Sequence, residues 1–99
     1  GEAMLNLHDI MCFTSVGHSV FAVTSGQVKI KIKATLKSLE KSLNDYGFVR
    51  CHISYIVNTR YIYSIESDKV LLDDKNEIPL SRYRADDVKK SLMNLMRSM

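Results

Sequence analysis

The sequence predicts a mainly β domain, in which short antiparallel strands form small packed sheets, with one short internal helix and one C-terminal helix. Three observations support this prediction: short apolar runs between turn residues in the first half, one stretch of strict apolar–basic alternation, and helical spacing at the C-terminal end. The chain has 99 residues, a single Pro and four Gly. This length and composition predict one mostly ordered domain over residues 1–99, with residues 1–3 resembling a cloning remnant.

Two strands are predicted near the start of the chain. Residues 10–13 form a short apolar run, and residues 19–24 form a second one that Gly26 closes. The segment between them, residues 15–18, has the composition of a turn. His18 is therefore expected at a loop tip or at the start of a strand.

The clearest strand signal lies in residues 27–33, where apolar and basic side chains alternate. Because successive strand residues point to opposite faces, this strand is expected to present on one face Val28, Ile30 and Ile32, and on the other Lys29, Lys31 and Lys33. Two explanations of the lysines remain open. Charged side chains discourage edge-to-edge aggregation of strands, and they also suit contact with a ligand.

A short helix is predicted next, over residues 36 to about 45. Thr35 can cap its N-terminus, and leucines recur at spacings of three and four, at positions 36, 39 and 43. Gly47 stands where a helix commonly ends. Residues 48–51 then form another short strand candidate.

The second half is predicted to begin with a hairpin. Residues 61–65 pair with residues 69–72 around a turn at 66–68, and residues 73–76 supply the next turn. Pro79 cannot donate a hydrogen bond to a sheet. Residues 78–80 are therefore at most an edge or terminal strand.

From about Tyr83 the chain is expected to be helical. Its apolar stripe, at helical spacing, consists of Val88, Leu92, Leu95 and Met99. Asp86 and Asp87 early in the helix and Arg97 late in it suit the helix macrodipole. Because the two predicted helices are separated by strands, the pattern excludes a helix-turn-helix, which needs two adjacent helices.

Charge is distributed unevenly along the chain. The formal net charge is +3, and between residues 27 and 60 seven Lys or Arg residues face only two acidic ones. Acidic residues cluster later, at Asp68, Asp73, Asp74 and Glu77. A basic face of this kind is typical of proteins that bind polyanions, and a merely solvated charged surface is the alternative.

Reactive residues do not converge in the sequence. Cys51 and His52 are neighbours, so on a strand they point to opposite faces and cannot form a nucleophile–base pair. The histidines are too scattered for metal ligation, and Cys12 and Cys51 match neither a zinc pattern nor a disulfide framework. We therefore expect no enzyme activity, no metal and no cofactor. With no membrane span or leader, a cytoplasmic location is expected.

Two segments carry a resemblance to a known family. Residues 48–58 read FVRCHISYIVN, with Ile62 after them, and residues 78–82 read IPLSR. These segments resemble the LytTR family, the DNA-binding output domains of bacterial response regulators. Residues 9–15 and 17–20 are similar to the opening of that family, and residues 36–40 to its helix. The resemblance covers nearly the whole chain, from about Leu5 to Met96.

The resemblance implies a fold of short antiparallel strands whose loops, rather than a recognition helix, enter successive DNA grooves. It places base contacts at three positions, His18, Ile53 and Arg82. The arginine fork of Arg82 suits the O6 and N7 atoms of guanine. The family usually has Arg, Lys or Asn where this chain has Ile53, and an isoleucine can only touch a thymine methyl group or pack inward.

The same motifs imply further roles around these positions. Phosphate contact or loop bracing is expected for Arg50, Ser54, Asn58 and Ser81. His52 is expected mainly to brace its loop through a hydrogen-bonded, half-buried imidazole. Oxidation of Cys51, beside it, is a weaker hypothesis for control of binding, because most such cysteines are simply small buried residues.

The predicted function is sequence-specific binding of double-stranded promoter DNA, at sites expected to be repeated, with a second copy of the chain on the adjacent repeat. At 99 residues the chain has no room for a receiver domain. It is therefore expected to be either a fragment of a two-domain regulator or a freestanding factor. A β-rich protein-interaction or ligand-sensing domain is the alternative. An RNA-binding domain is less favoured because the basic stretch lacks interleaved aromatics.

Overall fold

A computed structural model describes residues 5–99, so the predicted remnant at residues 1–3 lies outside the described residues. An antiparallel five-stranded sheet has the order β3-β2-β1-β5-β4 and consists of β1 (Ile10–Val16), β2 (Ser19–Thr24), β3 (Val28–Ile32), β4 (Phe48–His52) and β5 (Tyr55–Asn58). An antiparallel three-stranded sheet consists of β6 (Ile62–Ile65), β7 (Lys69–Leu72) and β8 (Glu77–Pro79). The helices are α1 (Leu36–Leu43) and α2 (Ala85–Arg97). The predicted mainly β fold with an internal and a C-terminal helix is confirmed.

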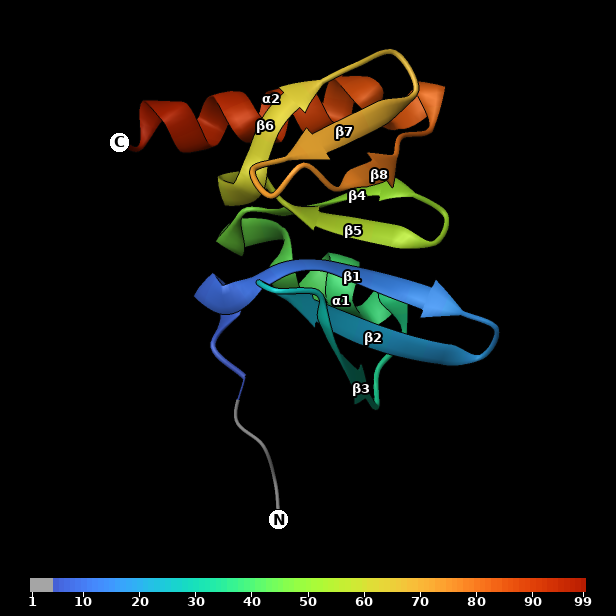
Figure 1. The fold of residues 1–99 in the computed structure, drawn as a ribbon. Coiled ribbons are helices and arrows are strands. Elements are labelled where there is room, and N and C mark those ends of the chain that lie inside the picture. Colours follow the sequence, from blue (N-terminus) through green and yellow to red (C-terminus); the bar gives the residue numbers. More distant parts are fainter. Residues whose placement is uncertain (1–4) are drawn as a thin grey trace.

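The five-stranded sheet lies between two layers. One of its faces packs against α1, around a cluster that includes Phe13, Phe48 and Ile56. Its other face packs against the three-stranded sheet, where Val57 meets Val70 and neighbouring residues. Helix α2 runs beside β4, and its Val88 is fully buried in the second cluster (Figure 1). Apolar burial on both faces explains why the central strands carry long apolar runs.

Strand β1 is longer than the predicted residues 10–13 and contains an irregularity. Its pairing with β2 shifts register between Ile10 and Cys12. Met11 and Cys12 therefore both face the second sheet, while Ile10 and Phe13 face α1. A β-bulge of this kind places two successive side chains on one face.

The predicted alternation in β3 is present, with one correction. Ile30 is half-buried and Ile32 packs against the α1-side cluster, whereas the lysines at 29, 31 and 33 are exposed. Val28 was expected on the buried face but is 54% exposed. It is the first residue of an edge strand and lies opposite Thr24, and it does not belong to the cluster that packs against α1.

Helix α1 begins as predicted. The Thr35 hydroxyl accepts a hydrogen bond from the Ser38 amide at 3.1 Å, a standard N-cap. The helix is shorter than predicted, because it ends at Leu43 and continues as the 3₁₀ turn Asn44–Tyr46. Gly47 follows in the left-handed region, with φ of 85°, which suits a residue that lacks a Cβ atom.

Strand β5 has no counterpart among the predicted strands, although it lies between β1 and β4. Three successive residues, Ile56, Val57 and Asn58, are buried, so β5 lacks the alternation that marks a half-exposed strand.

The remaining elements agree more closely with prediction. The hairpin β6–β7 is present, and β8 with Pro79 lies at the edge of its sheet. Met99 does not belong to the buried stripe of α2, since it is 94% exposed beyond the end of the helix. Within residues 5–99, no helix has both the length and the apolar character needed to cross a membrane.

Candidate nucleic-acid interface

Three turns meet at one edge of the molecule. They are the β1–β2 turn at residues 17–18, the β4–β5 turn at residues 53–54, and the 3₁₀ turn Arg82–Arg84 that leads into α2; we call them together the loop edge. Figure 1 shows all three on the right-hand side of the molecule. Because β1 and β5 are adjacent strands, the tips of the two hairpins lie about 10 Å apart, or two strand spacings.

Backbone hydrogen bonds tie the three turns together. The Ser15 amide donates to the Ser54 carbonyl at 3.0 Å, joining the end of β1 to the β4–β5 turn. The Ser81 amide donates to the Cys51 carbonyl at 2.8 Å, joining β4 to the Arg82–Arg84 turn. The sheet therefore holds the turns at fixed spacing.

All three predicted base-contact residues lie on the loop edge, one on each turn. His18 is exposed in the β1–β2 turn, beside Gly17 with φ of 60°. Ile53 is 69% exposed at the tip of the β4–β5 turn, so it does not pack inward. Arg82 is exposed at the start of the Arg82–Arg84 turn. Strand pairing thus brings together residues that are 64 positions apart in the chain.

His52 and Ser54 form the corners of the β4–β5 turn. The Ser54 amide donates to Nδ1 of His52 at 3.1 Å, and the His52 ring meets Tyr55 edge-on at 5.9 Å between centroids. With Nδ1 accepting, the neutral imidazole carries its proton on Nε2, which is left to donate elsewhere. The half-buried imidazole therefore shapes the turn.

Arg50 and Asn58 make contacts inside the protein. The Arg50 side chain is only 12% exposed and donates to the carbonyls of His52 and Ile53. Asn58 is 1% exposed; its amide nitrogen donates to the Ile10 carbonyl at 2.9 Å and its oxygen accepts from the Arg60 amide at 3.1 Å. These contacts hold loop and strand ends in place. Ser81, half-buried, precedes Arg82 as the N-cap residue of its turn.

Two further residues of the loop edge were missed in the sequence. Tyr83, next to Arg82, is 75% exposed, and Val16, at the end of β1 beside the His18 turn, is 60% exposed. Both large side chains are therefore turned to solvent on the same edge as His18 and Arg82. The adjacency of Tyr83 to Arg82 was the available signal, but the helical pattern there predicted only a helix start.

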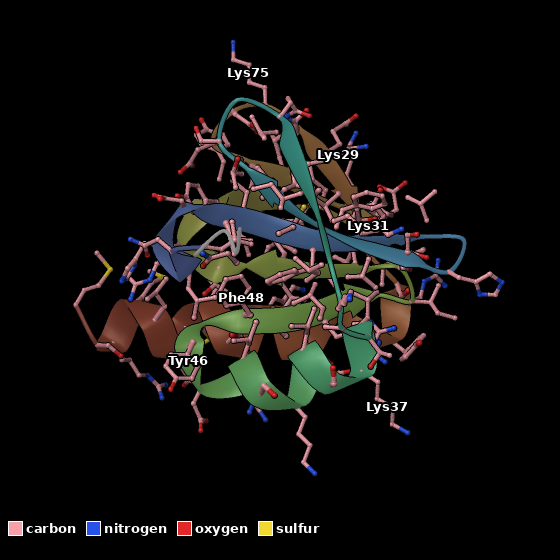
Figure 2. All side chains as sticks on the ribbon, turned by 90° about the horizontal axis from the view of Figure 1, so that it is seen from below. Lys29, Lys31, Lys37, Tyr46, Phe48 and Lys75 are labelled. Atoms are coloured by element: carbon pink, nitrogen blue, oxygen red, sulfur yellow. The ribbon has the colours of Figure 1, made fainter. Side chains whose placement is uncertain are left out.

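Basic side chains flank the loop edge on β3 and α1. Lys29 and Lys31 extend from one face of β3, toward the side on which the hairpin tips lie, and Lys37 extends from the first turn of α1 (Figure 2). Lys33 follows the last residue of β3, Ile32, which pairs with Val20 near the β1–β2 turn. This placement gives a positive flank beside exposed turns.

Neither cysteine is placed to react. Cys12 is 2% and Cys51 0% exposed, and both are free thiols in the second cluster. Burial raises the pKa of each thiol to about 12, so the nucleophilic thiolate is scarce at neutral pH. Across the described part of the chain, no group of three His, Cys, Asp or Glu side chains is arranged to hold a metal ion.

Comparisons with known proteins identify the family of this chain. A family model described as the LytTr DNA-binding domain matches residues 2–93. The sensory transduction protein LytT of Bacillus subtilis is 33% identical over 79% of this chain, and the match spans 42% of that protein. A LytTr DNA-binding domain from Bacillus cereus has a similar fold, with a TM-score of 0.79 and 24% identity, over 89% of this chain and 84% of that one.

Proposed function

The chain belongs to the LytTr DNA-binding domain family, and we propose from that premise that its loop edge is the surface that contacts DNA bases. The observation that carries this proposal is the convergence of three exposed turns on one edge, each presenting one predicted base-contact residue. Exposed turns held by a rigid sheet are suited to enter a groove without ordering on binding.

We assign the roles on chemical grounds. Arg82 is exposed and forked, so it can donate two hydrogen bonds to one guanine in the major groove. A ring N–H group of His18 can donate a hydrogen bond to an acceptor atom on a base edge. Ile53 can contact only apolar groups, and the thymine methyl is the apolar group that the major groove displays. We assign Ser54 and Ser81, at the turn corners, to phosphate contact, and Arg50, His52 and Asn58 to bracing of the turns.

The number of turns on the loop edge favours contact with successive grooves. Three separate turns along the loop edge offer more than one point of contact with DNA. On this proposal different turns enter successive grooves, while the lysines beside them face the phosphates.

The wider biological role is a second part of the proposal. The relative LytT is named a sensory transduction protein, and this chain corresponds to less than half of its length. We propose that the chain is the output domain of a bacterial response regulator. On this proposal it acts by binding promoter DNA, with copies on adjacent repeated sites, and not by catalysis.

Arg82→Ala tests the assignment of the loop edge. Duplexes selected in vitro by the wild-type chain are compared with random duplexes in gel-shift titrations. Loss of the guanine contact should weaken binding to the selected duplex by about 1–3 kcal/mol, and binding to random DNA far less. Arg97→Ala, which removes an equal charge near the far end of α2, is the matched control. Equal losses of affinity for selected and random duplexes would mean that Arg82 contacts phosphate and not a base.

The salt dependence of affinity distinguishes DNA binding from the alternative, a protein-interaction or ligand-sensing domain. Counterion release makes affinity for DNA fall steeply as salt rises, whereas a binding surface for a neutral protein or ligand responds weakly.

A further inference from the structure

We propose that Glu40, an acidic residue on α1, positions two turns of the loop edge at once and thereby sets sequence specificity without contacting DNA. This inference rests on the proposed function, since it assumes that the loop edge contacts bases. It assigns Glu40 a positioning role through two arginines, Arg50 and Arg84.

One carboxylate joins three elements of the fold. Oε1 of Glu40 accepts a hydrogen bond from Nη1 of Arg50, on β4, at 2.9 Å. Oε2 accepts from Nη1 of Arg84, at the start of α2, at 3.2 Å. The two arginine side chains are 12% and 22% exposed, and that of Glu40 is 38% exposed. Partly buried arginines need a partner charge, and Glu40 serves both.

The first arm reaches the β4–β5 turn. While Nη1 of Arg50 is held by Glu40, its Nε donates to the His52 carbonyl at 2.8 Å and its Nη2 to the Ile53 carbonyl. A guanidinium group is planar, with donors at fixed angles, so fixing one nitrogen fixes the direction of the others. Glu40 therefore sets the orientation of the backbone that carries Ile53.

The second arm reaches the Arg82–Arg84 turn. The Arg84 guanidinium lies over the Tyr83 ring, 5.3 Å from its centroid, within cation–π range. The Arg84 amide donates to the Ser81 carbonyl at 3.0 Å, which closes the turn around Arg82. A single side chain on α1 thus holds both the ring beside Arg82 and the turn that bears Ile53.

Because Glu40 is negatively charged, a positioning role and simple charge repulsion predict opposite changes in affinity for the selected duplex. An acidic side chain beside a surface that binds a polyanion weakens all DNA binding through Coulomb repulsion. On charge alone, Glu40→Gln should therefore tighten binding to every duplex. If Glu40 positions the turns, the same substitution should weaken binding to the selected duplex while random DNA binds as tightly or more tightly.

The experiment compares Glu40→Gln with Glu77→Gln in the full chain. Glu77→Gln makes the same change in net charge as Glu40→Gln. Glu77 lies on the three-stranded sheet, where it pairs with Lys69 and contacts neither Arg50 nor Arg84. We expect Glu40→Gln to lose about tenfold in affinity for the duplex selected by the wild-type chain, the scale of cost for losing a few ordered side chains. Glu77→Gln should not lower the ratio of selected to random affinity. Equal ratios for the two variants would overturn the proposal.

Hydrogen exchange without DNA gives an independent readout. In Glu40→Gln, the amides of Ser54 and Arg84 should exchange faster, while that of Val57 in the central strand should keep its protection. Faster exchange at Val57 as well would show a general loss of stability and overturn a positioning role. If the wild-type chain showed no preference for any selected duplex, the proposed function would fail, and the exchange pattern would still decide whether Glu40 orders the two turns.

Discussion

Ile53 stands at the tip of the β4–β5 turn, where the family this chain resembles usually carries a polar residue. The side chain is 69% exposed, and the turn beneath it is fixed by hydrogen bonds from Arg50 to two carbonyls. On the proposed function, this exposed isoleucine on a braced turn contacts a thymine methyl group in the major groove.

Ile53→Arg should fold normally, because its position is exposed and no core contact is lost. The new guanidinium group should raise affinity for all DNA and steepen the slope of log K against log salt by up to about 0.9, the value for one more phosphate neutralised. Thermal melting and binding at several salt concentrations measure both effects. Unchanged affinity and slope in a folded variant would place this turn away from DNA.

The buried thiols give a prediction about pH. An ordinary thiol has a pKa of 9.0, and burial raises the pKa of Cys12 and Cys51 to about 12. Below pH 9 both states keep these protons, and above it the unfolded chain releases them while the folded chain does not. Stability should therefore fall between pH 9 and about 12, by up to about 1.4 kcal/mol per thiol for each pH unit.

Urea denaturation at pH 8 and pH 10 measures this effect. The wild-type chain should lose more stability over this step than the Cys12→Ala, Cys51→Ala double variant, whose other titrating groups are the same. Native thiols should also resist alkylation and peroxide at pH 7.5, which argues against redox control through Cys51. Rapid modification of Cys51 in the folded chain would contradict this account.

At the scale of single elements, the junction between α1 and β4 is under the tightest constraint. Gly47 adopts φ of 85°, its carbonyl accepts from the Thr59 hydroxyl at 2.8 Å, and a Cβ atom added to it would lie 3.2 Å from that hydroxyl oxygen. The junction thus has both a backbone and a packing requirement. It aligns β4, and with it Arg50, against the rest of the sheet.

Gly47→Ala is expected to destabilise the domain more than Gly26→Ala does. Both glycines have similar positive φ values, 85° and 82°, so both substitutions should cost about 1–2 kcal/mol in backbone strain. At Gly26 nothing lies within 4 Å of the added atom, whereas at Gly47 the Thr59 contact should add about 1 kcal/mol or more. The urea midpoints of the two variants give the comparison. Equal losses of stability would mean that the Thr59 side chain moves aside without cost.

At the scale of the whole molecule, charge and shape act together. The basic side chains of β3 and α1 extend toward the loop edge, whereas Arg97 lies near the C-terminal end of α2, on the opposite side of the molecule (Figure 1). On the proposed function, the positive flank supplies affinity for phosphates that is independent of sequence. The turns then supply the discrimination between sequences.

Lys33→Gln tests this division of roles. It should weaken selected and random duplexes alike and reduce the salt slope by about 0.9. Arg97→Gln removes the same charge near the far end of α2 and should leave the slope nearly unchanged. If the two variants have equal slopes, the phosphate-contacting surface is not the β3 flank.

Sequence patterns alone predicted the mainly β class, the Thr35 cap, the hairpin β6–β7 and the edge position of Pro79, because each depends on local conformational preference. They also selected His18, Ile53 and Arg82 through a family resemblance, and their contact with bases stays a prediction. Strand β5, the bulge in β1 and the exposure of Val28 and Tyr83 escaped prediction. Each of these depends on which neighbours cover a strand or a turn.

The amino-acid sequence by itself determined the local elements and the chemistry available to them: apolar spacing, capping groups, turn residues and the charge of each segment. Only the tertiary structure decided which turns share an edge, which side chains brace them and which face outward. The adjacency of β1 and β5 and the joining of Arg50 and Arg84 by Glu40 are long-range contacts. Such contacts follow from closing the whole sheet around a shared core, and no local window of sequence contains that information.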